Sequence, residues 1–470
     1  MITYFTSPSG NDNATGTSSE QAFATLIRAH EAVRQHAGKE PVTICLHEGT
    51  YTLKDTLSFT EKDSGTESAP IVYCAYKQEH VRIIGGQTRT QSESVTDKAT
   101  LKSPLVTFTH AHHIAFQNIT FEYTHSNGIV VEGGKHIQIA GCTICNIGNT
   151  GIVIKGGTHH QVQSCNIFHT GGAGISVNGG NRQTLTRAEH AIDNCHIHDI
   201  AQGVETNDPG IKVTGVGIRL SHNHIHNGPH SAILLTGNEH HIEYNHIHHV
   251  CLETGGGAFY MGCDWTERGT RIQYNYFHDV GGPEQESMGL CLDNCASGAI
   301  IIGNVFVRCT QAIFIGGGRN HRVDNNVFVQ CEPALQIDGR GLDKRPVWHN
   351  MIYTTMKPSF EIMNPLEPPY SDYYPELHEV ARYYQAENGI PPEGNLILRN
   401  ISYQSTWHKI HWHATPKIVA LQNNLIDEDP HFIGLDHDNY QLHEDSPAFE
   451  IGIKPIPFDQ MGLYKDSFRL

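Results

Sequence analysis

The short element Asn223-His-Ile225 returns as Asn245-His-Ile247, Asn275-Tyr-Phe277, Asn304-Val-Phe306 and Asn326-Val-Phe328, and this repetition decides the fold. Its pattern is a small polar residue followed two positions later by Ile or Phe. Four further copies, three of them beginning with Cys, are Cys142-Thr-Ile144, Cys165-Asn-Ile167, Cys195-His-Ile197 and Asn350-Met-Ile352. Successive copies start 22–30 residues apart. A repeat of this period indicates a solenoid.

Each repeat contains short runs of alternating apolar and polar residues, such as Gly151-Ile-Val-Ile-Lys155 and Gly289-Leu-Cys-Leu-Asp293. Alternation with a period of two predicts strands, and the intervening Gly and Asn predict turns. A unit of two or three short strands cannot bury its apolar side alone, so it must stack on its neighbours. The Leu spacing of a leucine-rich solenoid is missing. We therefore predict an all-β parallel β-helix whose Asn and Cys column forms a ladder at an inner corner, with a spacing of about 4.8 Å.

The chain, 1–470, is predicted to be a single β-helix domain. Residues 1–40 are expected to cap it, because the apolar residues from Ala22 to Arg34 recur at helical spacing. Regular rungs are predicted over 110–350, and residues 396–470 should hold the last rungs and a C-terminal tail. The segment 354–395, rich in Pro and aromatic residues, is predicted to be an insertion. It is either a lid or wall beside a groove, or a rung bulge packed on the coil.

The composition narrows the choice of partner. Asp and Glu total 49 against 32 Lys and Arg, which gives a formal net charge of −17. This balance argues against nucleic acid and against anionic membrane surfaces. The sequence lacks a run of about 18 apolar residues and the layout of a signal peptide. If Met1 is the native start, we expect a cytoplasmic protein with reduced thiols. No cofactor or metal is predicted, and a homo-oligomer is left open.

Two carboxylates stand out in the repeat register. Asp264 and Asp293 each lie 11 residues before a ladder Asn, at a position where other repeats carry no acid. They are therefore predicted to stand on adjacent rungs, about one strand spacing apart. Retaining glycosidases hold their two catalytic carboxyls about 5–5.5 Å apart, with one kept protonated as the acid. The alternative is a pair of turn Asp residues that bind backbone amides or a calcium ion.

Further residues near this pair are candidates for binding a sugar. Asp338 and Arg340 could contact hydroxyl groups on the same face, and the rung of Asp264 contributes an acid, two aromatic residues and a base: Glu253, Tyr260, Trp265 and Arg268. An aromatic ring beside an acid is a typical surface for a sugar ring. For each residue taken alone, a packing or turn role is an equal alternative.

Many of the 34 histidines also fall in columns. One column is His196, His224 and His246, and a second is His198, His226, His248 and His278. Because the Ile or Phe between them faces inward, these imidazoles are predicted to face outward. They could line a substrate groove, with His248 as a contact, or hold a transition metal. Stacking of imidazoles on one another is the simpler interpretation.

Several motifs resemble a known family. Gly228-Pro-His-Ser-Ala-Ile-Leu234, Cys263-Asp-Trp265, Leu292-Asp-Asn-Cys-Ala-Ser-Gly298 and Ile337-Asp-Gly-Arg-Gly341 resemble glycoside hydrolase family 141. The resemblance implies a right-handed β-helix and α-L-fucosidase or xylanase activity. It also implies an Asp pair matching Asp264 and Asp293, and it adds His230 as a candidate substrate contact. The β-xylosidases of family 120 share a Leu-Asp element that matches Asp293 as nucleophile, but their acid/base Glu would fall at Gly316. In family 141 an acid often follows the Glu-Thr-Gly element, where this chain has Gly256.

These observations together predict an exo-acting, retaining glycoside hydrolase that releases a neutral, fucose-like or xylose-like sugar from an oligosaccharide. Asp293 would be the nucleophile and Asp264 the general acid/base. Two alternatives stay open: a polysaccharide lyase or epimerase of the β-helix class, and a carbohydrate-binding β-helix without activity.

Overall fold

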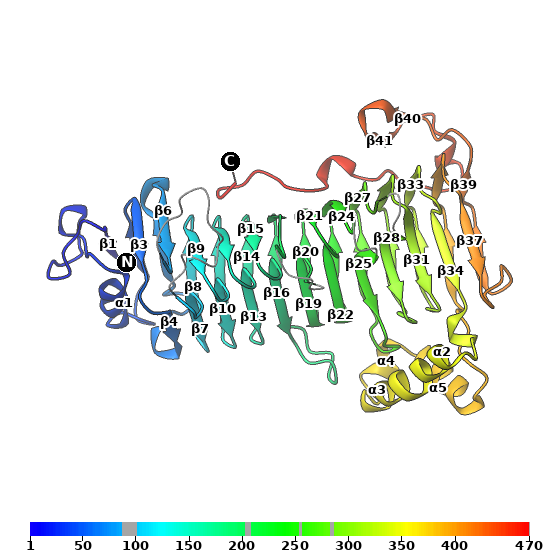
Figure 1. The fold of residues 1–470 in the computed structure, drawn as a ribbon, viewed down its shortest axis with the longest axis horizontal. Coiled ribbons are helices and arrows are strands. Elements are labelled where there is room, and N and C mark those ends of the chain that lie inside the picture. The colour runs from blue at the N-terminus through cyan, green and yellow to red at the C-terminus, as the bar shows by residue number, and fades with distance from the viewer. Residues whose placement is uncertain (87–100, 203–207, 253–255, 283–285, 470) are drawn as a thin grey trace. The chain divides into compact units, whose positions relative to one another are not determined.

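The computed structural model describes residues 1–86, 101–202, 208–252, 256–282 and 286–469. They form two compact units, of which the first comprises 1–180, 188–212 and 464–470, and the second 181–187 and 213–463. In both units all strands except β40 and β41 belong to three parallel sheets, here called A, B and C (Figure 1). The chain visits the sheets in turn, and each strand pairs with its counterpart one turn later. This arrangement is the predicted parallel β-helix.

The strands of the first unit are short. Sheet A holds β1 (Ile2–Thr6), β2 (Val42–Leu46), β5 (Ile71–Ala75), β8 (His112–Gln117), β11 (Lys135–Ala140), β14 (Gln161–Gln163) and β17 (Ala191–Asp193). Sheet B holds β3 (Gly49–Thr52), β6 (Val81–Ile84), β9 (Thr120–Thr124), β12 (Thr143–Ile147), β15 (Asn166–Thr170) and β18 (His196–His198). Sheet C holds β4 (Leu57–Thr60), β7 (Val106–Thr109), β10 (Ile129–Glu132), β13 (Ile152–Lys155) and β16 (Ile175–Gly179). Strand β19 (Ile211–Val216) contains the change from the first unit to the second.

The second unit continues the same order of sheets. Sheet A holds β20 (Arg219–Ser221), β23 (His241–Glu243), β26 (Arg271–Gln273), β29 (Ile300–Ile302), β32 (Arg322–Asp324), β35 (Asn395–Leu398) and β38 (Val419–Gln422). Sheet B holds β21 (His224–Gly228), β24 (His246–Val250), β27 (Tyr276–His278), β30 (Val305–Val307), β33 (Val327–Val329), β36 (Ile401–Tyr403) and β39 (Leu425–Ile426). Sheet C holds β22 (Ile233–Asn238), β25 (Gly256–Gly262), β28 (Ser287–Asp293), β31 (Gln311–Gly316), β34 (Leu335–Asp338) and β37 (His408–His411).

The predicted ladder is present in the core of the second unit. The Nδ2 atom of Asn275 donates to Oδ1 of Asn304 at 2.9 Å, and Asn304 donates in the same way to Asn326 at 3.0 Å. Two residues after each of these Asn positions, Phe277, Phe306 and Phe328 stack inside the coil with ring centroids 5.0 and 5.3 Å apart. The buried side-chain amides thus form hydrogen bonds with one another along the stack, while the aromatic rings supply apolar contact.

The ladder prediction is wrong at Asn350. Residues around it are helical, in α2 (Pro346–Asn350) and the π-helix Met351–Met356, and not a strand. Asn326 instead donates to Asn400 at 3.0 Å, and Asn400 donates to Asn424 at 2.9 Å. The three-residue pattern occurs by chance inside a helix, because a triplet is too short to distinguish a strand from a helix.

The insertion between β34 and β35 is a small helical layer. It contains the 3-10 helix Arg340–Leu342, α2, the π-helix, α3 (Lys357–Ile362), α4 (Tyr370–Tyr373) and α5 (Leu377–Ala386). Figure 1 shows these helices, in yellow, gathered beside the strands of the second unit. The apolar side of this helical insertion packs on Trp265 of the coil, in a cluster that includes Met356, Tyr370, Leu377 and Tyr384.

The first unit begins with a strand. Strand β1 pairs in register with β2, so residues 1–40 contribute a rung as well as a cap. The predicted helix is α1 (Leu26–Arg34), whose first turn is capped by Thr25, which accepts a hydrogen bond from the Arg28 amide. The tail returns to this unit: Tyr464 N donates to Asn194 Oδ1 at 2.9 Å, and Ser164 donates to Asp466 at 2.7 Å.

The second unit also carries a pair of antiparallel strands, β40 (Phe432–Gly434) and β41 (Asn439–Leu442). None of the helices in the described residues has the length and apolar character needed to cross a membrane.

Candidate active site

Asp293 occupies the end of β28, where the alternating pattern turns it outward. Leu290 and Leu292 are fully buried, whereas the side chain of Asp293 is 21% exposed. On the preceding rung, Tyr260 in β25 also points outward, between the buried Phe259 and Met261. The Tyr260 hydroxyl donates to Asp293 Oδ2 at 3.2 Å. An accessible carboxylate and a phenol therefore meet on the outer face of sheet C. Tyr260 was predicted on the rung of Asp264, and the structure shows its hydroxyl in contact with Asp293 of the next rung.

Arg340 holds Asp293 from the other side. Its Nη1 donates to Asp293 Oδ1 at 2.5 Å and to Asn294 Oδ1 at 3.0 Å, and its Nη2 donates to Asp338 Oδ2 at 2.8 Å. Gly316 lies between the two acids, paired with Asp338. A Cβ at Gly316 would stand 2.8 Å from the Arg340 guanidinium carbon, so glycine leaves the space that this guanidinium fills. One cation thus links carboxylates of β28 and β34.

Asp338 was predicted to contact sugar hydroxyls together with Arg340, and this prediction is wrong for Asp338. The residue is 1% exposed, and its two oxygens accept hydrogen bonds from the Arg340 side chain. Asp338 therefore positions Arg340, and Arg340 in turn positions Asp293.

Aromatic rings surround this group. The Arg340 guanidinium carbon lies 4.5 Å from the ring centre of Trp348 in α2 and 5.0 Å from that of Phe314 in β31. Trp412, which follows β37 and is 45% exposed, lies with its ring centroid 6.4 Å from that of Trp348. Sequence analysis did not identify either tryptophan. Trp348 fell within the predicted regular rungs, 110–350, whereas in the structure it belongs to α2, before the predicted insertion at 354–395. Nothing in the sequence indicated that α2 contacts Arg340.

Asp264 does not occupy the position predicted for it. In the ladder between β25 and β28, Gly262 and not Asp264 is the partner of Asp293. The following turns do align as predicted, since Gly269 N donates to Gly298 O. The register therefore shifts by two residues between the strand and the turn. Counting back from the ladder Asn missed this shift, because it assumed turns of equal length.

A second group of charged residues forms around Asp264. Arg182 donates to Asp264 Oδ2 from both terminal nitrogens at 3.1 Å, and Thr266 donates to Oδ1 from its amide and hydroxyl at 2.8 and 2.7 Å. Glu267 also pairs with Arg182, at 3.6 Å. Glu267 is 4% exposed, and burial, followed by the charge of Asp264, raises its pKa to about 8. The carboxyl that carries a proton at neutral pH is therefore Glu267.

Arg182 and Glu267 were both missed from the sequence. Arg182 lies more than one repeat before Asp264, in a connection between strands, so the repeat register gave no indication of this contact. Glu267 follows Asp264 by three residues, and this spacing was a signal that could have been used.

Trp265 and Arg268 were predicted to bind a sugar, and the structure corrects both assignments. Each is fully buried, so neither can touch a bound sugar from solvent. Trp265 Nε1 donates to the Tyr384 hydroxyl at 2.7 Å, and Arg268 Nη1 donates to Glu376 Oε1 at 2.9 Å. Both residues attach the helical insertion to the coil.

The remaining predicted contacts lie elsewhere. His248 is in β24 of sheet B, whereas Asp293 and Tyr260 are on sheet C, so His248 is not brought to this group. It belongs instead to the predicted imidazole columns, with its ring 4.9 Å from His226 and 4.6 Å from His278. His230 is partly exposed in the connection between β21 and β22. Glu253 lies outside the described residues.

Comparison with known sequences supports the fold. The family model described as a Pel9A-like right-handed β-helix region matches residues 4–222, and that of the right-handed β-helix region matches 209–354. The chain is also 35% identical over 143 residues to the uncharacterized protein YwoF of Bacillus subtilis. This match covers 29% of the chain and 27% of that relative.

Solved structures with the same fold include hydrolases and lyases. A complex of XylC with xylose has a TM-score of 0.55 at 12% identity, covering 92% of this chain and 87% of that one. The alginate lyase AlyGC of family PL6 has a TM-score of 0.61 at 13% identity, covering 99% and 59%. A structure named glycoside hydrolase has a TM-score of 0.52 at 14% identity, covering 79% and 100%. At these identities the likeness establishes the architecture alone: the chain is a right-handed parallel β-helix.

Proposed function

We propose that this protein is a glycoside hydrolase that acts on a neutral sugar and uses Asp293 as its catalytic carboxylate. The observation that carries the proposal is the accessible Asp293 carboxylate, fixed by Tyr260 and Arg340 on the outer face of the coil. A carboxylate held in one orientation by a phenol and a guanidinium is suited to attack at an anomeric carbon. The resemblance to family 141 and the carbohydrate-active enzymes among the structural neighbours agree with this assignment.

The local charge favours a hydrolase over a lyase. A lyase or epimerase of uronates needs a cation to neutralise the substrate carboxylate. Here Arg340 is shared by two carboxylates, Asp293 and Asp338, so the group is negative as a whole. A negative site repels an acidic sugar and accepts a neutral one.

The second carboxyl of the proposed reaction is Asp264. Asp293 forms a bond to the anomeric carbon, the glycosidic bond breaks, and the departing oxygen takes a proton. We propose that Asp264 delivers this proton as the general acid, and that the neighbouring Glu267, whose raised pKa keeps it protonated at neutral pH, supplies it. A water molecule, losing its proton to the Asp264 and Glu267 pair, then releases the sugar with its anomeric configuration retained.

The proposed exo mode rests on the helical insertion. Trp348 of α2 stands over Arg340, next to Asp293. We propose that this helix blocks the approach to Asp293 from one side, so that only the terminal sugar of a chain reaches Asp293. The released sugar is proposed to be fucose-like or xylose-like.

The experiment is a screen of nitrophenyl glycosides, including α-L-fucoside, β-xyloside and α-L-arabinoside, with wild type and Asp293→Asn. The expected result is release of nitrophenol by wild type and a loss of at least about 10³-fold in the variant. Asp324→Asn is the matched control, since Asp324 also ends a strand and pairs with arginines, but on sheet A. It should keep full activity.

Three results would contradict the proposal. A product that is unsaturated and absorbs in the ultraviolet would indicate a lyase. Binding of a sugar without turnover, unaffected in Asp264→Asn/Asp293→Asn, would indicate a carbohydrate-binding protein. Initial release of the inverted anomer, followed by NMR, would reject the retaining mechanism.

A further inference from the structure

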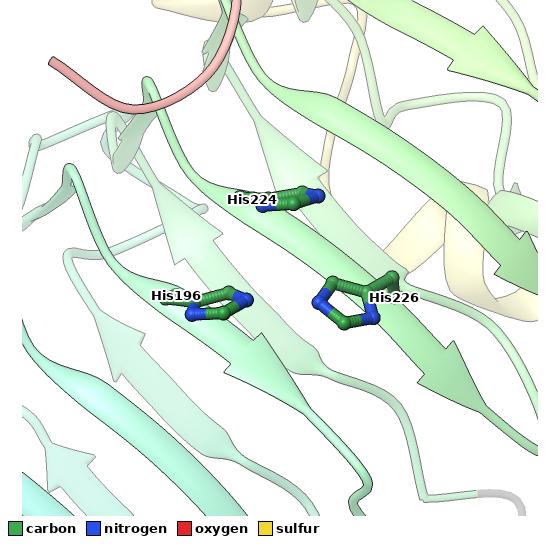
Figure 2. A group of neighbouring side chains, drawn as sticks. All are labelled: His196, His224 and His226. Atoms are coloured by element: carbon green, nitrogen blue, oxygen red, sulfur yellow. The ribbon is translucent and has the colours of Figure 1, made fainter.

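Sheet B of the second unit carries two neighbouring columns of imidazoles. Strand register places His224 beside His246, and His226 beside His248 and then His278. Rings within each column stack: His224 and His246 have centroids 4.6 Å apart, and His248 and His278 also 4.6 Å. Figure 2 shows His224 and His226 projecting from the same strand, β21, and their ring centroids are 4.7 Å apart. The two columns are therefore close enough for nitrogen atoms to meet between them.

The ring nitrogens face one another across the columns. His224 Nε2 lies 2.8 Å from His248 Nε2, and His246 Nε2 lies 2.7 Å from His278 Nε2. At these distances only one nitrogen of each pair can carry a hydrogen, so the other directs its lone pair into the same space. One ring nitrogen from each of His224, His246 and His248 lies within 4.8 Å of the other two.

We propose that His224, His246 and His248 form a binding site for a divalent transition-metal ion of the zinc class. Zinc binds imidazole nitrogen at about 2.0–2.1 Å, and tetrahedral geometry then requires nitrogens about 3.3–3.4 Å apart. The facing pair must separate by a fraction of an ångström and the stacked pair must approach each other. All three side chains extend from the outer face of sheet B, and rotation about their side-chain bonds would supply these shifts. A water molecule would complete the tetrahedron.

The donor set selects the kind of ion. Asp279, the acid that contacts His278, is already engaged: it accepts from His278 Nδ1 at 2.6 Å and from Arg308 Nε at 2.7 Å. The proposed site therefore offers nitrogen ligands alone. Imidazole suits Zn²⁺, Ni²⁺, Cu²⁺ or Co²⁺, whereas Ca²⁺ and Mg²⁺ need oxygen. The ion would link β21 and β24 and thereby stabilise two successive rungs.

The test titrates Co²⁺ into the full chain after treatment with a chelator, and follows the visible absorption of tetrahedral Co²⁺. Wild type is expected to bind one tight equivalent that Zn²⁺ displaces, and Zn²⁺ is expected to raise Tm. His246→Gln should weaken the affinity at least about tenfold and abolish the rise in Tm. His224→Gln is the second variant, in case His246→Gln does not fold without metal.

The matched control is His136→Gln. His136 lies in another imidazole stack, with ring centroids 4.6 Å from His113 and 4.9 Å from His159. This control removes one of the many histidines and should bind Co²⁺ as wild type does. Equal binding by His246→Gln and wild type, or an equal loss in His136→Gln, would overturn the proposal and indicate adventitious binding to surface imidazoles. None of these measurements depends on glycosidase activity.

Discussion

At the scale of single residues, the arrangement around Arg340 determines what Asp293 can do. The guanidinium is 7% exposed and lies between a buried acid, Asp338, and an accessible one, Asp293. A buried ion pair contributes little net stability, but removing one partner is costly because the other charge is left buried. The pair therefore acts chiefly to orient Asp293.

This argument predicts the response to substitution of Arg340. Arg340→Met is expected to lower the free energy of unfolding by about 3–5 kcal/mol, because Asp338 keeps its charge and loses its cation. The double variant Arg340→Met/Asp338→Asn should recover part of that loss, as measured by urea denaturation. A loss below about 1 kcal/mol in the single variant, or no recovery in the double one, would show that Arg340 does not compensate Asp338.

At the scale of elements, the turns decide which side chains meet. The shift of two residues between β25 and β28 makes Gly262, and not Asp264, the ladder partner of Asp293, and the insertion after β34 brings Trp348 to Arg340. The strands themselves are held in register by the buried Asn ladder, in which each amide bonds to the next.

The ladder predicts a difference between its middle and its end. Asn275 is fully buried, and its substitution by Ala leaves the amide and side chain of Asn245 without their acceptor. Asn275→Ala is expected to cost about 3 kcal/mol or more, since each buried unsatisfied group costs about 1–3 kcal/mol. Asn424→Ala, at the partly exposed end of the ladder, should cost clearly less. Equal urea midpoints for the two variants would show that burial does not increase the contribution of a ladder Asn to stability.

At the scale of the whole molecule, buried histidines explain part of the unusual composition. His240 and His321 accept backbone hydrogen bonds from Ile218 N and Ala299 N, both at 3.2 Å, on the preceding rung. Burial lowers the pKa of each to about 4. These imidazoles are therefore neutral structural elements of the core, like the Asn residues of the ladder.

The lowered pKa values predict acid sensitivity. Between pH 6.5 and 4 the unfolded chain binds protons that the folded chain excludes, so stability falls as the pH falls. Over this pH window each of the two histidines lowers the free energy of unfolding by up to about 3 kcal/mol. Urea denaturation should give a much smaller free energy of unfolding at pH 5 than at pH 7. In His240→Gln/His321→Gln this difference between the two pH values should be smaller. If the free energy of unfolding of this variant depends on pH as strongly as that of wild type, these two residues are not the source of the acid sensitivity.

The sequence alone determined the architecture, because a repeat with strand periodicity can bury its apolar side only by stacking on copies of itself. It also identified the Asn ladder, the capping helix, the insertion and the imidazole columns. Each of these follows from local alternation or from the period.

Only the tertiary structure decided which charged groups meet. Arg340 reaches Asp293 from another turn of the coil, Trp348 of the insertion contacts Arg340, and Arg182 reaches Asp264 from 82 residues away in the sequence. Trp265 and Arg268, adjacent to Asp264 in sequence, are buried under the helices instead. The reason is physical: strand periodicity fixes the direction of a side chain, whereas turn lengths and inserted segments vary from rung to rung and set its neighbours.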